Sequence, residues 1–98
     1  MRESLSWQVT ARQLHLSGEL KRETLLALWA ERESVMKQVD IIDVSALDRV
    51  DSAGLALLVH LRQIALGQGN TLHFTGITDK LHSLITLYNL QQIIVSPV

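Results

Sequence analysis

A carboxylate, a hydroxyl and two small residues stand directly before the most apolar run of the chain, in the segment "RVDSAGLALLVHL" at residues 49–61. The first amides of an α-helix lack partners within the helix, and either Asp51 or Ser52 can accept hydrogen bonds from them. The same amides, at the positive end of the helix dipole, can also receive an acidic side chain or a phosphate. Ala53 and Gly54 leave room for the backbone of a partner. Two interpretations stay open: a helix cap alone, or a cap that is also a binding site.

The helix that follows has two apolar stripes when residues 51–68 are projected on a helical wheel. One stripe is an ordinary core face, made of Gly54, Leu57, Leu58, Leu61, Ile64 and Ala65. The opposite stripe holds Ser52, Leu55, Val59 and Leu66, bordered by Arg62 and Gln63. Either the rest of the domain covers both stripes, or the second stripe meets another protein, as exposed apolar strips with polar rims do. The second alternative predicts a partner-binding set of Asp51, Ser52, Ala53, Gly54, Leu55, Val59, Arg62 and Leu66.

Histidine and aspartate residues of the chain are candidates for metal binding or acid–base catalysis. None of His15, His60, His73 and His82 pairs with a further ligand at a recognised metal-binding spacing, and the chain has no cysteine. Asp43, Asp48 and Asp51 could suggest acid–base work or Mg²⁺ binding, but neither a nucleophile–base set nor a glycine-rich phosphate loop accompanies them. We therefore predict no catalytic residue, metal or cofactor. A small enzyme or ligand-binding domain that uses Asp43 and Asp51 stays open as an alternative.

Composition narrows the possible partners. The chain has 98 residues, of which 47% are hydrophobic and 19% charged, with a formal net charge of −1. This predicts one globular domain over residues 1–98. Lys and Arg are not clustered, which argues against nucleic-acid binding. The chain shows neither a signal peptide nor a run of roughly 20 apolar residues, so we expect a cytoplasmic protein that reaches a membrane only through partners.

Hydrophobic periodicity predicts an α/β domain. Alternation indicates strands at 5–10 and 13–18, joined by a two-residue turn, and further strands at 40–45, 71–75 and 93–98. Helical spacing appears at 24–37, at 55–66 and from Thr78, a good N-cap, to about Asn89. The order ββαβαβα, followed by a short strand, predicts a small mixed sheet with helices packed chiefly on one face.

The segment "IIDVSALDRVDSAGLALLVHL" resembles the signature of STAS domains, the fold of anti-sigma-factor antagonists. In that family a strand ends in Asp–hydrophobic–Ser, and Asp–Ser/Thr–small–Gly–Leu opens a leucine-rich helix. The resemblance extends to "LHLSGEL" and to the last helix, so it covers nearly the whole chain and implies the STAS fold. In the partner-switching members the residue before the motif glycine is a phosphorylated serine. Here it is Ala53, so the resemblance supports that mechanism poorly; an anti-sigma factor antagonist is kept as the alternative function.

Among STAS proteins, the chain is most similar to the small standalone subunits of the ABC systems that transport phospholipid and maintain outer-membrane lipid asymmetry in Gram-negative bacteria. The similarity lies in "LSGEL" with "LLALW", in "RVDSAGLALLVHL" and in "DKLHSLITLYNL". It implies a non-enzymatic protein that binds the cytoplasmic ATPase subunit, and through it the permease, at the inner membrane. Ser52 would match the hydroxyl residue of the contact helix.

Overall fold

The computed structural model describes residues 4–91 and contains four strands and four helices over that range. The strands are β1 (Leu5–Thr10), β2 (Gln13–Leu20), β3 (Ile41–Val50) and β4 (His73–Thr75). The helices are α1 (Leu26–Ala30), α2 (Arg32–Val35), α3 (Ser52–Gly67) and α4 (Asp79–Leu87). The predicted strand at 93–98 lies outside the described residues. None of the helices within residues 4–91 combines the length and hydropathy needed to cross a bilayer.

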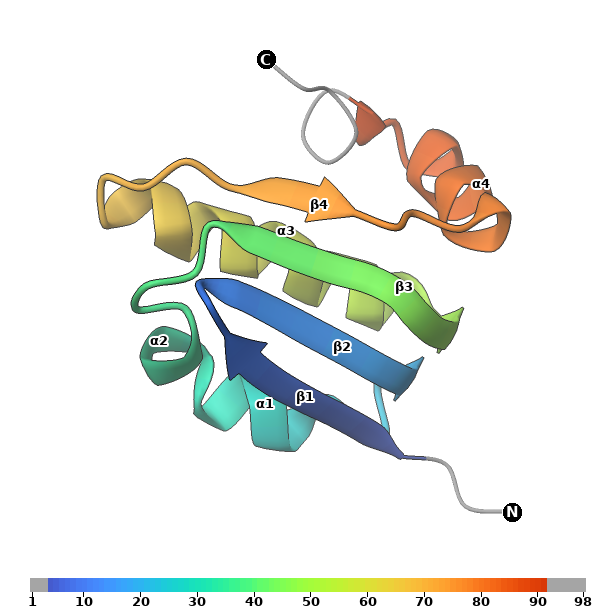
Figure 1. Cartoon of the computed structure of the whole chain (residues 1–98). Helices are drawn as coiled ribbons and strands as arrows, with labels where there is room; N and C mark the ends of the chain where they lie inside the picture. The colour runs from blue at the N-terminus through green and yellow to red at the C-terminus, as the bar shows by residue number, and fades with distance from the viewer. Residues whose placement is uncertain (1–3, 92–98) are drawn as a thin grey trace.

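The strands form one mixed sheet in the order β1-β2-β3-β4. β1 and β2 pair antiparallel, whereas β2–β3 and β3–β4 are parallel, as expected when helices connect them. In Figure 1, α3 runs behind the strands, with α1 and α2 on the same side toward β1. The prediction of a small mixed α/β sheet with helices chiefly on one face is confirmed.

The residue types of the hairpin turn between β1 and β2 do not indicate its turn type, but its backbone angles do. Ala11 and Arg12 both have positive φ, 49° and 68°, as the two central residues of a type I′ turn must. Neither residue type favours that conformation. The Arg12 guanidinium lies 3.0 Å from the Asp40 carboxylate, so an ion pair ties the turn to the residue before β3.

The predicted helix at 24–37 is two short helices, because the hydrogen-bond ladder breaks at Glu31. The Glu31 amide bonds back to Leu28, a tight three-residue turn that ends α1. The Trp29 carbonyl then accepts a hydrogen bond of 2.7 Å from the Arg32 side chain. A side chain thus satisfies a backbone group at the break, which periodicity alone does not predict.

The central strand β3 is longer than the predicted 40–45 and continues to Val50. After a first register shift it pairs again with β2, where Leu47 lies beside Gly18, and after a second shift Val50 lies beside Leu20. Leu47 is buried in the core. The extension brings the start of α3 against the end of β2.

Alternation along the strands separates a buried from an open sheet face. Leu14 and Leu16 of β2 and Ile42 and Val44 of β3 are buried against the helices, together with Leu57, Leu58, Leu61 and Ala65 of α3 and Leu81 and Ile85 of α4. The intervening His15 and Asp43 are half-buried on the opposite face, which faces solvent.

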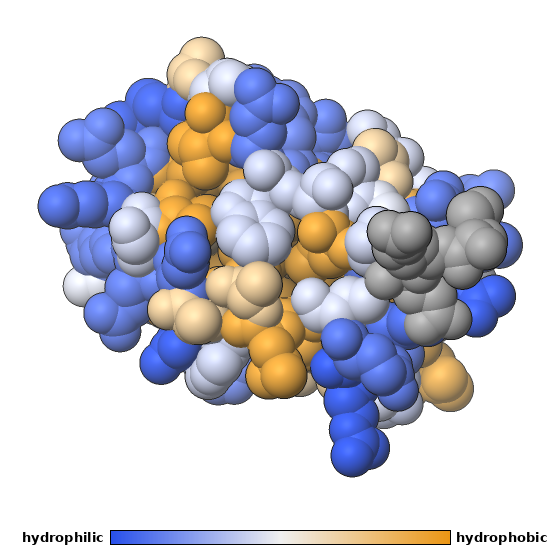
Figure 2. All heavy atoms as spheres, turned by 90° about the horizontal axis from the view of Figure 1, so that it is seen from below, coloured by the Kyte–Doolittle hydropathy of each residue, from blue (hydrophilic) through white to orange (hydrophobic). Residues whose placement is uncertain are grey.

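The edge at β1 is covered less completely, because α1 and α2 are short. Trp7, predicted as core, is only half-buried, while Val9 of β1 is 46% and Leu26 of α1 is 68% exposed. Figure 2 shows the apolar side chains on this edge of the molecule, interrupted and rimmed by polar ones.

Candidate functional site

The start of α3 is held by the carboxylate of Asp51. Its Oδ1 accepts a hydrogen bond of 2.8 Å from the Gly54 amide, which is the N-cap interaction expected at this position. Its Oδ2 accepts a second hydrogen bond, of 3.1 Å, from the Arg22 amide in the loop between β2 and α1. Asp51, the cap residue, is therefore half-buried, and its carboxylate joins two segments of the chain.

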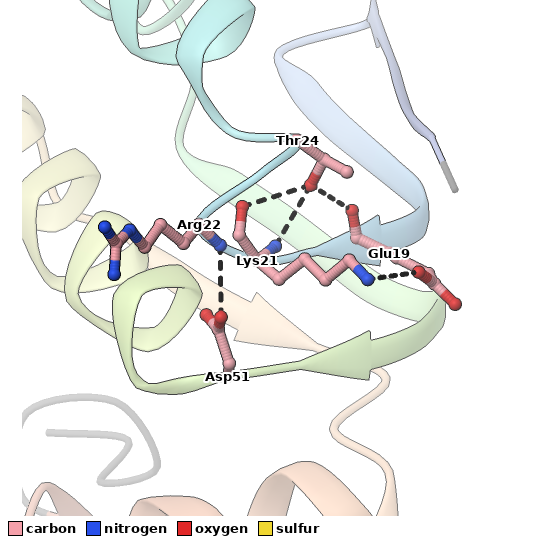
Figure 3. A network of polar contacts seen from close by, with 5 residues as sticks. All are labelled: Glu19, Lys21, Arg22, Thr24 and Asp51. Carbon is pink, nitrogen blue, oxygen red and sulfur yellow. Dashed lines mark hydrogen bonds and ion pairs between the residues drawn. The ribbon is translucent and has the colours of Figure 1, made fainter. Parts of the chain in front are cut away.

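The loop that Asp51 holds is itself ordered by polar contacts (Figure 3). Thr24 Oγ1 donates to the Glu19 carbonyl at 2.6 Å and accepts from the Lys21 amide at 3.1 Å. The Lys21 ammonium lies 3.2 Å from Glu19 Oε1, and only 12% of the Lys21 side chain is exposed. These contacts set the position of residues 21–24 beside the first turn of α3.

Gly54 is a packing residue rather than an opening for a partner. It is buried, and a Cβ added there would lie 2.9 Å from the Leu20 carbonyl carbon and closer still to its oxygen. Only glycine lets α3 approach the end of β2 this closely. The expectation that Gly54 leaves the first turn bare for a partner is wrong.

Leu55 also departs from the prediction. It was expected on the outward stripe, but it is only 2% exposed and belongs to the core cluster. A helical wheel gives the angle between side chains, but the neighbouring elements decide how wide an arc of the helix they cover. At its first turn α3 is covered over an arc that includes Leu55.

The exposed face of α3, hereafter the α3 face, is narrower than the predicted stripe. Its exposed residues are Ser52, Ala56, His60, Gln63 and Leu66, which follow one another at helical spacing. Val59 on the same side is half-buried and packs against the core, and Leu66 is 45% exposed. Of the predicted set, Ser52 and Leu66 are exposed, Asp51, Ala53, Val59 and Arg62 are half-buried, and Gly54 and Leu55 are buried.

An aromatic contact that sequence reasoning missed borders the α3 face. The rings of Trp29 and His60 meet edge-on, with centroids 5.2 Å apart and planes at 80°. The Arg32 guanidinium lies over the Trp29 ring, 3.9 Å from its centroid. Trp29, predicted as core, is thus half-buried and reaches the surface beside α3. No sequence signal relates residues 29 and 60.

Of the three aspartates considered for catalysis or Mg²⁺ binding, Asp43 and Asp51 make hydrogen bonds within the fold. Asp43 Oδ1 accepts from the Ser45 amide at 3.0 Å, and its Oδ2 lies 3.2 Å from His15 Nδ1. The backbone hydrogen bond from Ser45 is the main cause that lowers the pKa of Asp43 below its usual value of 3.8. Asp48 is exposed at the surface of β3. Within residues 4–91, no three His, Asp or Glu side chains come together where they could hold a metal ion.

Comparison with known proteins assigns the family. The family model described as "Mlab, STAS domain" matches residues 3–96. Two curated relatives, from Escherichia coli (strain K12) and Shigella flexneri, are each 50% identical to the chain over 90 residues, which cover 92% of this chain and 93% of theirs. Both are named intermembrane phospholipid transport system binding protein MlaB.

A solved structure supports the fold. The phosphorylated Bacillus cell fate determinant SpoIIAA superposes with a TM-score of 0.65 at 14% identity, covering 92% of this chain and 87% of its own. At that identity the likeness concerns the fold alone. The family model matches nearly the whole chain, and the two relatives are half identical to it over almost their full length, so the chain is a member of the MlaB-type STAS domain family.

Proposed function

We propose that this protein is a non-enzymatic subunit that binds the ATPase of the phospholipid-transporting ABC complex and supports its assembly or activity. It acts at the cytoplasmic side of the inner membrane and contacts the permease only through the ATPase. The α3 face is the docking surface. The alternative, an anti-sigma factor antagonist, has less support because the two relatives at 50% identity are both named for phospholipid transport.

The observation that carries the proposal is the composition of the α3 face. Ser52 and Ala56 stand one turn apart, both exposed and both small, and Val59 and Leu66 leave apolar surface uncovered beyond them. Small residues allow another helix or strand to come close. Each Å² of apolar surface removed from water stabilises a complex by about 25 cal/mol, before the cost of association.

Rigidity at the start of α3 favours recognition. Asp51 caps the helix and holds the adjacent loop, so Ser52 stands at a defined position instead of on a mobile loop. A preorganised surface loses less entropy on binding than a flexible one. Ser52 would set the register of the partner, and the apolar residues would supply buried area.

The test is affinity purification of the tagged protein with Ser52→Lys and with a matched control. Ser83 is a serine on an exposed position of α4, so Ser83→Lys makes the same change on another helix. We expect wild type and Ser83→Lys to retain the ATPase and permease, and Ser52→Lys to lose both while melting as cooperatively as wild type. Equal retention by the two lysine variants would contradict docking on α3. A wild-type protein that recovers neither subunit would contradict the function itself.

A further inference from the structure

The α3 helix carries no acidic residue along its sixteen positions. Its ionisable side chains are His60, exposed on the α3 face, and Arg62, half-buried on the flank. This is notable because the whole chain has a net charge of −1, with ten acidic against nine basic residues. The helix that we propose for docking thus carries an arginine on its flank and no carboxylate of its own, in a chain that is slightly acidic overall.

A second arginine is held beside the first turn of α3. The backbone of Arg22 is fixed by its hydrogen bond to Asp51, and its side chain is exposed. In Figure 3 this side chain points away from the Glu19–Lys21 pair and toward the side where α3 lies. Both oxygens of the Asp51 carboxylate accept backbone hydrogen bonds, one from the Arg22 amide and one from the Gly54 amide.

A third arginine, Arg32, lies on the same side of the molecule as the α3 face. Its guanidinium stacks on the Trp29 ring, and that ring contacts His60 of α3. Within residues 4–91, the ion pairs of the structure join Arg12 to Asp40, His15 to Asp43 and Lys21 to Glu19, and none involves Arg22, Arg32 or Arg62. Acidic residues do occur nearby, at Glu23, Glu31 and Glu33, but they are exposed on the loop and on the α1–α2 segment, outside α3.

We infer that the segment of the partner that docks on α3 is acidic, with carboxylates that meet Arg22 at one end of the face and Arg62 further along it. The inference rests on the proposed docking to the ATPase and names the chemistry of the partner surface. Cations at the rim of an apolar contact steer an acidic partner and raise the association rate, while the apolar centre supplies most of the affinity.

The experiment measures association rate and Kd between the purified protein and its ATPase subunit at about 0.1 M and about 0.5 M salt, where the screening length falls from about 10 Å to under half of that. We expect Arg22→Glu and Arg62→Glu each to slow association about tenfold at the lower salt, and the effect to shrink at the higher salt. Arg22→Gln and Arg62→Gln remove the charge without reversing it and should show smaller losses. Lys37→Glu, at an exposed site beyond α2, makes the same charge change outside α3 and should leave binding unchanged.

The outcomes separate this inference from the proposed function. If binding depends on Ser52 but not on Arg22 or Arg62, the inference that the partner segment is acidic is overturned, while the proposal of docking on α3 still stands. Equal losses for Lys37→Glu and for the two arginine reversals also overturn it, because net charge would then explain the effect. If a glutamate variant fails to melt cooperatively, the glutamine variants decide. If the wild-type protein does not bind the ATPase, the proposed function falls and this inference falls with it.

Discussion

Asp51 accepts a hydrogen bond from the backbone amide of Arg22, 3.1 Å away and 29 positions earlier in the chain. The same carboxylate caps α3 through the Gly54 amide. One side chain therefore stabilises a helix and fixes the loop beside it, so the folding of the domain and the shape of its proposed docking surface depend on the same residue.

Two substitutions at Asp51 separate these roles. Asn caps a helix about as well as Asp, but its amide nitrogen cannot accept from Arg22. We expect Asp51→Asn to lower the free energy of unfolding by about 1 kcal/mol, and Asp51→Ala by about 2–3 kcal/mol because both hydrogen bonds are lost. Urea unfolding measures both. No loss for Asp51→Asn would mean that the Arg22 contact contributes nothing to stability, and equal losses for the two variants would mean the same for the cap on the Gly54 amide.

At Gly54 we expect even the smallest addition to be harmful. A Cβ there meets the backbone of Leu20, which cannot move without shifting β2. Gly54→Ala should lower the free energy of unfolding by about 1–3 kcal/mol or more, although alanine is normally the better helix former. Gly67 is the matched control, since an added Cβ at that end of α3 meets nothing within 4 Å. A Gly54→Ala protein as stable as Gly67→Ala would refute the packing assigned to this glycine.

The same substitution at two leucines of α3 distinguishes its buried from its exposed side. Leu55 is 2% exposed and Leu66 is 45% exposed. Leu55→Ala should cost about 2–5 kcal/mol because it leaves a cavity, and Leu66→Ala well under half of that. Thermal melts compare their stability and ATPase pull-downs their binding, where Leu66→Ala should weaken retention without unfolding the protein. Comparable melting of both variants would place Leu55 outside the core.

Asp43 makes stability depend on pH at the acidic end. Its pKa lies below the usual value in the folded protein, chiefly because the Ser45 amide donates to the carboxylate. A lowered folded-state pKa gives stabilisation that is present above the unfolded-state pKa, about 4, and is lost as the pH falls through the folded value. Wild type should therefore exceed Asp43→Asn in stability at neutral pH, and the gap should close in acid. Unfolding midpoints measured from about pH 7 to about pH 2 test this, and a gap that stays constant would count against it.

Local sequence determined the elements whose signals lie within a few residues. The alternation at 5–10 and 13–18 predicted the hairpin, and Thr78 caps α4 as expected, with its hydroxyl accepting from the Leu81 amide. Asp51 was one of two predicted caps for α3, and the structure selects it over Ser52. These features depend on backbone geometry and on hydrogen bonds between near neighbours, which the residue types carry directly.

Contacts between distant segments were decided only by the tertiary structure. The helical wheel placed Leu55 on the outward stripe, but the surrounding elements cover it. Strand β3 continues to Val50 because β2 lies beside it. The Trp29–His60 and Asp51–Arg22 contacts join segments about thirty residues apart. Periodicity indicates in which direction each side chain points from its own helix or strand. It does not indicate on which sides other parts of the fold pack against that element. The sequence therefore predicted the helix that we propose for binding, while the packing of α3 against the rest of the fold decided which of its residues are exposed.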